Sequence, residues 1–281
     1  GKFAMIPVLE PSTQQEAYDM MAYAYQLSEE TKLPVLMRVV TRLAHSRAGV
    51  VVKKPLPQNG LNPETDRTHW VLLPANARRQ YADLVGKQGD LLASSGASPY
   101  NKKVSAEGKA KLGVIACGIA YNYVMENEPQ KQDIPVLKVS QYPLPEAVIK
   151  ALAEQCEALL IAEDGQPLVE EQVKSILGAD YPLKGRLTGD LPRMGELTPD
   201  SVGDALGVHI EQPYANAQNV MPRPPALCQG CGHRDVYDAL NKVAAEYEGA
   251  RIFGDIGCYT LGALPPFRAI DSCVDMGASI T

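Results

Sequence analysis

Leu112-Gly113-Val114-Ile115-Ala116 is the stretch that decides the fold, because it is a short apolar run that ends at the turn Cys117-Gly118. Similar runs follow at residues 136–139 and 158–162. Helices are expected between and after these runs, at residues 120–125, 145–156 and 168–177. Short apolar strands that alternate with helices are typical of a parallel sheet covered on both faces. The sequence therefore predicts an α/β fold with a compact parallel-sheet domain over residues 110–178.

A separate α/β unit is expected near the N-terminus. Residues 12–30 have helical spacing of apolar side chains, with Ser12 as the N-cap and Gln15 at the capping-box position. A short β-rich run follows at residues 35–40. The strand that should precede this helix is cut away or reduced to residues 3–9.

Two irregular segments connect the ordered parts. Residues 53–105 are interrupted by several prolines and glycines, which predicts an extended linker with one short helix around residues 75–92. Residues 178–226 are also rich in proline and read as a connector with a short helix near 199–206. A second α/β unit then begins, with a helix at residues 233–247 and a strand at residues 250–253.

The overall charge and hydropathy exclude some classes of protein. The 281 residues contain 27 Lys and Arg against 33 Asp and Glu, a net charge of −6, and no basic cluster. A nucleic-acid surface therefore has no electrostatic basis. No apolar run approaches the ~20 residues that span a bilayer, and no export signal is visible. A cytoplasmic location is expected. Since Gly1 lies within an apolar phrase and the sequence stops just after Ser279, we interpret the chain as a piece of a longer protein.

Four of the six cysteines, Cys228, Cys231, Cys258 and Cys273, lie in the last 54 residues. A disulfide framework is not expected in a chain of this size without a secretion signal. Metal binding or redox chemistry is the better interpretation for this group. The other two cysteines lie in apolar runs and are expected in the core: Cys117 and Cys156.

Cys228-Gln229-Gly230-Cys231 is a CxxC motif, which alone fits zinc, an iron–sulfur cluster, thioredoxin-type redox chemistry or two unligated thiols. Cys258 follows at a glycine turn and could supply a third ligand. Because no second CxxC pair follows, a zinc ribbon is disfavoured. His233, two residues beyond the motif, could contact a cofactor or substrate, and helix capping is an equal alternative.

The glycine turn Gly254-Asp255-Ile256-Gly257-Cys258 follows a predicted strand, and parallel sheets bind ligands at the carboxyl ends of their strands. It does not have the G-x-G-x-x-G spacing, so a dinucleotide fingerprint is not supported. The phrase Met276-Gly277-Ala278-Ser279 could begin a helix that points at a phosphate. A tight structural turn and plain helix packing are the alternatives for these two phrases.

Three phrases occur in order: CQGCGHR at residues 228–234, GDIGCYTLGALPP at 254–266 and DSCVDMGASI at 271–280. Together they closely resemble the thiamine-diphosphate-binding domain of the large (alpha) subunit of indolepyruvate:ferredoxin oxidoreductases. The resemblance covers essentially the whole chain. It implies that residues 1–52 end a pyrimidine-binding domain, 53–108 form a linker, 109–215 form a transketolase-C-like domain and 216–281 begin the thiamine-diphosphate-binding domain.

The resemblance also implies a reaction. Such enzymes oxidatively decarboxylate an aryl 2-oxoacid, pass electrons through iron–sulfur clusters to ferredoxin and transfer the acyl group to coenzyme A. The implied partners are a beta subunit, ferredoxin, coenzyme A and the 2-oxoacid substrate. Gly254, Asp255, Ile256, Gly257 and Cys258 would border thiamine diphosphate, which Met276, Gly277, Ala278 and Ser279 would line. Cys228, Cys231 and Cys258 would hold a 4Fe–4S cluster, with Cys273 as a possible fourth ligand.

Other parts of such a site are not expected within these residues. The activating glutamate would lie upstream of Gly1, and the Mg²⁺ motif and a further cluster domain would lie downstream of Thr281. The isolated segment is therefore expected to be inactive. Arg38, Arg42 and His45 end a predicted strand near the expected site, and structural ion pairs are their favoured role.

Two other functions are compatible with parts of the sequence. A non-oxidative thiamine-dependent decarboxylase or lyase would share the same domains, but it has no use for clustered cysteines as an electron relay. A non-catalytic CxxC metal-binding module would explain the cysteines and would leave the glycine turn and the phrase at residues 276–279 without a role.

Overall fold

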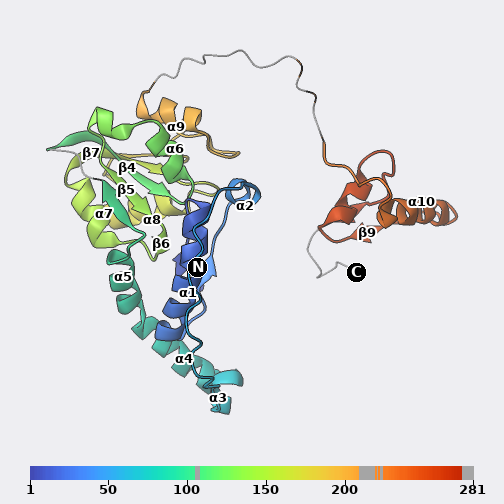
Figure 1. Ribbon diagram of the computed structural model, residues 1–281, viewed down its shortest axis with the longest axis horizontal. Coiled ribbons are helices and arrows are strands. Elements are labelled where there is room, and N and C mark those ends of the chain that lie inside the picture. Colours follow the sequence, from blue (N-terminus) through green and yellow to red (C-terminus); the bar gives the residue numbers. More distant parts are fainter. Residues whose placement is uncertain (105–107, 209–218, 220, 222–223, 274–281) are drawn as a thin grey trace. The chain divides into compact units, whose positions relative to one another are not determined.

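The three predicted apolar runs are neighbouring strands of one sheet (Figure 1). The computed structural model describes residues 1–104, 108–208, 219, 221 and 224–273. The strand order is β3-β5-β4-β7-β8, with β4 parallel to β5 and β7, β8 parallel to β7, and β3 antiparallel to β5. The strands are β3 (Lys102–Val104), β4 (Ala110–Cys117), β5 (Val136–Val139), β7 (Cys156–Ala162) and β8 (Leu183–Lys184). The predicted α/β fold is confirmed.

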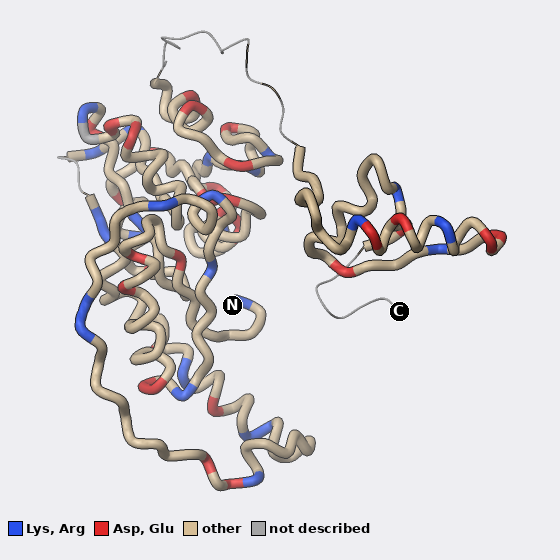
Figure 2. The backbone as a smooth tube through the Cα atoms, turned by 45° about the vertical axis from the view of Figure 1, so that its right-hand side comes forward, with Lys and Arg blue, Asp and Glu red and all other residues tan. Residues whose placement is uncertain are grey.

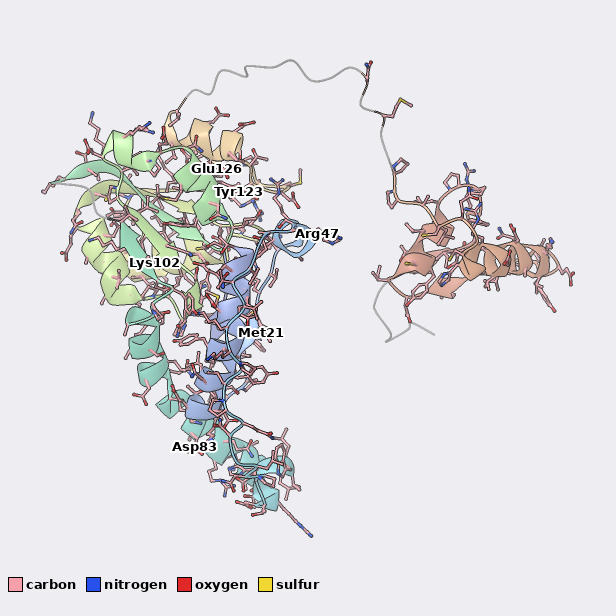
Figure 3. The ribbon with its side chains drawn as sticks, viewed as in Figure 1. Met21, Arg47, Asp83, Lys102, Tyr123 and Glu126 are labelled. Carbon is pink, nitrogen blue, oxygen red and sulfur yellow. The ribbon has the colours of Figure 1, made fainter. Side chains whose placement is uncertain are left out.

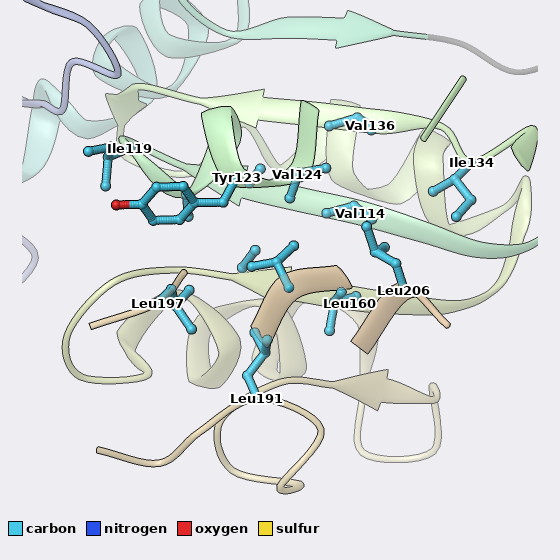
Figure 4. Close-up of a cluster of buried hydrophobic side chains, with 14 of the residues drawn as sticks. Val114, Ile119, Tyr123, Val124, Ile134, Val136, Leu160, Leu191, Leu197 and Leu206 are labelled. Atoms are coloured by element: carbon cyan, nitrogen blue, oxygen red, sulfur yellow. The ribbon is translucent and has the colours of Figure 1, made fainter. Parts of the chain in front are cut away.

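Helices cover both faces of this sheet because alternate residues of its strands point in opposite directions. Val114 and Leu160 face a core that they share with α6 (Ala120–Glu126) and α9 (Pro199–Leu206), as Figure 4 shows. On the other face, their neighbours Ile115 and Ile161 pack against α7 (Glu146–Ala153) and α8 (Leu168–Leu177). The predicted two-sided cover is therefore confirmed, and Cys117 and Cys156 are buried in the second core as expected.

The N-terminal α/β unit is built on a smaller, three-stranded sheet. Its order is β2-β1-β6, and β1 is parallel to β2 and antiparallel to β6. Its elements are β1 (Val8–Leu9), β2 (Leu36–Met37) and β6 (Gln141–Tyr142), with α1 (Gln14–Thr31) between β1 and β2 and α2 (Thr41–His45) after β2. The predicted cap at Ser12 is wrong by one residue. Thr13 caps α1, because its Oγ1 accepts a hydrogen bond from the backbone N–H of Glu16 at 3.1 Å.

The segment at residues 53–105 is more ordered than the sequence predicts. It contains α3 (Arg67–Trp70), α4 (Pro74–Gly86), α5 (Gln88–Gly96) and the edge strand β3. Pro74 stands at the start of α4, where a missing N–H costs nothing, so it begins a helix instead of breaking one. Asn101 fastens the end of this segment, since its Nδ2 donates to the carbonyl oxygen of Gln141 at 3.0 Å.

The chain divides into two units, Gly1–Glu211 and Gln212–Thr281, and the second has its own small core. Tyr237, buried at 3% exposure, packs there with Leu227 and Ala269. The elements of this unit are α10 (Gly232–Ala244), β9 (Phe253–Gly254), the 3-10 helix η2 (Cys258–Ala263) and β10 (Ser272–Cys273), which is parallel to β9. A further 3-10 turn in the first unit is η1 (Pro129–Gln132).

Charged residues of both signs are scattered along the chain, separated by longer stretches of other residues (Figure 2). In the described residues, none of the helices has the length and apolar character required to cross a membrane.

Candidate functional site

The CxxC motif forms a tight turn at the start of α10. The N–H of Cys231 donates to the carbonyl oxygen of Cys228 at 3.2 Å, and Gly230 between them has a φ of +73°, which glycine adopts without strain. Cys228 is exposed, whereas Cys231 is half-buried against the core of the second unit. The sequence thus places both sulfurs at one helix terminus, with Cys228 the more accessible.

His233 connects this turn to the segment that follows Cys258. Its Nδ1 lies 3.2 Å from the sulfur of Cys231. Its ring stacks on Tyr237 with 6.3 Å between ring centres and meets the ring of Tyr259 edge-on at 5.7 Å. Tyr237 in turn donates its hydroxyl proton to the carbonyl oxygen of Tyr259 at 2.6 Å. His233 and Tyr237 therefore link the CxxC turn to Tyr259, the residue after Cys258.

The glycine turn lies at the carboxyl end of β9 and is held by two side chains from outside it. The hydroxyl of Thr260 accepts from the N–H of Gly257 at 3.0 Å and donates to the carbonyl oxygen of Asp255 at 3.3 Å. The thiol of Cys273 donates to the same carbonyl oxygen at 2.8 Å. Because β10 is parallel to β9 and ends at Cys273, the sheet register brings this thiol to the turn.

Asp255 carries an unsatisfied acceptor at this turn. Its Oδ1 is buried and has no hydrogen-bond partner among the residues that the structure describes. A buried carboxylate oxygen without a partner is costly, and bound ligands or ions are common reasons for one. Oδ1 of Asp255 is thus the one buried side-chain acceptor at this turn that no described group satisfies.

Comparison with known proteins identifies relatives of the whole chain. Indolepyruvate oxidoreductase subunit IorA of Methanothermobacter marburgensis is 35% identical over 298 aligned residues, which covers 100% of this chain and 48% of the relative. IorA of Thermococcus kodakarensis is 36% identical over 306 aligned residues and covers 100% of this chain and 46% of the relative. The predicted family resemblance is confirmed. The chain spans about half the length of these curated IorA relatives.

Two solved structures align with parts of the chain at low identity. A 2-oxoglutarate:ferredoxin oxidoreductase from Magnetococcus marinus aligns with 49% of this chain and 24% of its own at 18% identity and a TM-score of 0.35. An inactive split-gene transketolase aligns with 72% of this chain and 57% of its own at 15% identity and a TM-score of 0.41. No family model matches the sequence.

In the part of this IorA-like chain that the structure describes, the cysteines are not grouped as a set of metal ligands. Within the described ranges, no three His, Cys, Asp or Glu side chains are grouped so that they could hold a metal ion. Cys258 is exposed at the start of η2, and Cys273 is used to fix the glycine turn. Among the described residues, Cys228, Cys231 and Cys258 are therefore not drawn together into one ligand set. Met276, Gly277, Ala278 and Ser279 lie outside the described residues.

The basic residues after β2 have structural partners. Arg38 pairs with the buried carboxylate of Glu10, and Arg42 lies 2.8 Å from a carboxylate oxygen of Glu196. The guanidinium of Arg42 also lies 5.5 Å from the ring centre of Tyr123, which Figure 3 labels on α6. The predicted structural ion pairs are thus present for both arginines. The sequence analysis did not identify the acidic partners of these arginines. Glu10 could have been indicated as one of them, because it directly follows an apolar strand.

Proposed function

We propose that this chain is the central part of the large subunit of an IorA-type enzyme, a thiamine-diphosphate-dependent 2-oxoacid:ferredoxin oxidoreductase. In this proposal the second unit begins the cofactor-binding domain. The observation that carries it is the glycine turn, residues 254–258, because it combines the family phrase with a buried unsatisfied oxygen at the end of a parallel strand.

The turn's residues would position one end of the cofactor. Thiamine diphosphate, when bound, supplies the electron sink that makes loss of carbon dioxide from a 2-oxoacid possible. Asp255 would accept a hydrogen bond from the cofactor or contact a cation beside it through its free Oδ1. Thr260 and Cys273 hold the backbone of the turn, so that little ordering is required when a ligand binds.

The electron-transfer part of the proposal concerns three thiols. We propose Cys228, Cys231 and Cys258 as ligands of a 4Fe–4S cluster in the assembled enzyme. Cys228 and Cys231 would contribute from the CxxC turn and Cys258 from the start of η2, and the cluster would supply one-electron transfer. Ferredoxin, coenzyme A, an aryl 2-oxoacid and a beta subunit are the proposed partners, and the cytoplasm is the proposed location.

A cofactor-binding experiment tests the role of Asp255. The longer protein from which this segment comes is purified with its partner subunit, and thiamine diphosphate is titrated in with Mg²⁺ while tryptophan and tyrosine fluorescence is recorded. Asp255→Asn should weaken binding at least ~10-fold, in proportion to a lost charge-assisted contact. Asp238→Asn is the matched control, because Asp238 is exposed on α10 of the same unit. Equal affinities of the two variants would contradict the proposed role of the turn.

Iron and sulfide analysis of the same complex tests the thiols. We expect the wild type to contain a cluster whose iron content falls when Cys228 or Cys258 is changed to Ser. Cys156→Ser is the control, since Cys156 is buried in the first unit. A fully active enzyme whose iron content is the same in all these variants would favour other cluster ligands, and an active iron-free enzyme would favour a non-oxidative lyase.

A further inference from the structure

The CxxC turn holds two free thiols in a backbone conformation that suits a disulfide between them. The hydrogen bond from the N–H of Cys231 to the carbonyl oxygen of Cys228, 3.2 Å long, closes a four-residue turn. Such turns bring their end Cα atoms within about 7 Å of each other, and disulfides bridge Cα atoms about 4.4–6.8 Å apart. An S–S bond can therefore close here with little movement of the backbone.

Both ends of the turn are anchored to the second unit. Leu227, the residue before Cys228, is buried in the small core, and its carbonyl oxygen accepts from Arg234 of α10 at 3.3 Å. Cys231 is the N-cap of α10 and packs against the same core. The turn is thus fixed before any reaction, which gives its two thiols a high effective concentration for each other.

The two thiols differ in their access to solvent. Cys228 is exposed, whereas Cys231 is half-buried, and Nδ1 of His233 lies 3.2 Å from its sulfur. Since thiol–disulfide exchange depends on access to the attacking sulfur, a dissolved disulfide should react with Cys228 first. Cys231 is then the thiol that lies nearest along the chain to the product. This asymmetry is the usual division between an attacking and a resolving thiol.

We propose that the CxxC turn is a thiol–disulfide exchange site for small disulfides of the glutathione type, with Cys228 attacking and Cys231 resolving. In the first step the sulfur of Cys228 bonds to one sulfur of the substrate, whose S–S bond breaks, and the released thiol takes up the proton that Cys228 gives up. In the second step the sulfur of Cys231 bonds to that of Cys228, and the second substrate thiol leaves with the proton of Cys231. The two cysteines are oxidised to one disulfide, and the substrate is reduced to two thiols.

This reaction competes with metal binding for the same two sulfurs. A thiolate is the form of cysteine that binds metal, so a disulfide between Cys228 and Cys231 would block loading of the cluster proposed above, and its reduction would restore loading. This consequence rests on the proposed function, whereas the exchange reaction itself requires no iron.

Cys258 provides an internal comparison. It is exposed, as Cys228 is, but no other cysteine lies within three residues of it in the sequence. The thiol of Cys273 donates to the carbonyl oxygen of Asp255 at 2.8 Å. An adduct that forms on Cys258 should therefore persist, whereas an adduct on Cys228 should be resolved.

Peptide mass spectrometry of the reduced, iron-free 281-residue chain tests the exchange reaction. The chain is treated with glutathione disulfide at about pH 8, where free thiols are partly ionised, and samples are quenched at timed intervals with N-ethylmaleimide. We expect a disulfide between Cys228 and Cys231 as the main product, a lasting glutathione adduct on Cys258 and none on Cys228. A lasting adduct on Cys228, or a disulfide that joins Cys258 to either cysteine of the turn, would overturn the proposal.

Single variants separate the two roles. Cys231→Ser should keep glutathione on Cys228, because the resolving thiol is missing, and Cys228→Ser should slow the oxidation of Cys231 at least ~10-fold. Cys258→Ser is the matched control and should form the wild-type disulfide at an unchanged rate. Circular dichroism checks folding, and if Cys231→Ser is unfolded, Cys228→Ser decides. Rapid addition of glutathione to Cys231 in folded Cys228→Ser would overturn the assigned order.

Iron uptake by the longer protein with its partner subunit tests the competition. Iron(II) and sulfide are added to the complex before and after oxidation with glutathione disulfide. We expect the oxidised complex to take up much less iron than the reduced one, and dithiothreitol to restore uptake. Equal uptake by both forms would contradict the competition. No uptake by the reduced complex would contradict the proposed cluster and not the exchange site, which is measured without iron.

Discussion

Arg186 donates from Nη2 to Oδ1 of Asp164 at 3.1 Å, and the two side chains are only 1% and 9% exposed. The same guanidinium donates to three backbone carbonyl oxygens, those of Glu163 at 3.0 Å, Pro192 at 2.6 Å and Gly195 at 3.2 Å. One cation therefore fixes both the turn after β7 and the irregular loop that follows β8.

Replacement of this cation should be strongly destabilising. Arg186→Met leaves Asp164 buried without its partner, so we expect the free energy of unfolding to fall by about 3–5 kcal/mol. The double variant Arg186→Met, Asp164→Asn should lose less than the sum of the single changes. Urea denaturation measures both. The exposed Arg193→Met serves as control, and an equal loss in that variant would show that charge in general is responsible.

The stability of the first unit should depend on Glu163 in a defined pH window. Because the pKa of Glu163 is raised from 4.5 to about 7, the folded chain holds a proton that the unfolded chain releases. Stability should therefore fall as pH rises from about 4.5 to about 7, by up to about 3 kcal/mol, and then level off. Urea denaturation across pH 5 to 8 should show this slope in the wild type and a shallower slope in Glu163→Gln. If the free energy of unfolding of the wild type minus that of Glu163→Gln rose with pH over this range, the raised pKa of Glu163 would be contradicted.

Gly262 should not tolerate a side chain. A Cβ at this buried position would lie 2.5 Å from ring atoms of Tyr237, the central residue of the second unit's core. Gly262→Ala should destabilise this unit by about 1–3 kcal/mol. Gly232→Ala is the control, since nothing lies within 4 Å of the added atom. Hydrogen exchange over residues 224–273 should accelerate in Gly262→Ala only.

The six thiols should react with iodoacetamide in an order set by exposure. Cys228 and Cys258 are exposed and should be modified first, with Cys231 and Cys273 following more slowly. Cys117 and Cys156 should react only after unfolding, because burial raises the pKa of both thiols, that of Cys117 well above the ordinary value. Peptide mass spectrometry at timed intervals resolves the order. Rapid native modification of Cys117 would be inconsistent with the second core.

The parallel sheet could be predicted because its signal is local. The strands β4, β5 and β7 are mostly apolar, with one charged residue in each, and such strands favour burial on both faces. The order in the 53–105 segment could not be predicted in the same way. Its stability depends on long-range contacts, such as the pairing of β3 with β5 and the bond from Asn101 to Gln141, which leave no periodic pattern in the sequence.

The candidate sites differ in the same respect. The CxxC and glycine phrases could be recognised because their residues are adjacent in the chain. Glu10, Arg38 and Glu163 are separated by up to about 150 positions and follow strands of two different sheets, and only the tertiary fold brings them to one cavity of the first unit. The role of Cys273 as a support for the glycine turn likewise depends on the register of β10 with β9.

The pairing of β1 with β6 affects the cooperativity of unfolding. β6 begins two residues after β5, and the N–H of Glu10 donates to the carbonyl oxygen of Ser140 at 2.7 Å, between these two strands. The N-terminal segment is therefore hydrogen-bonded to the continuation of a central strand of the large sheet. Residues 1–52 and the parallel-sheet region should therefore melt in a single transition.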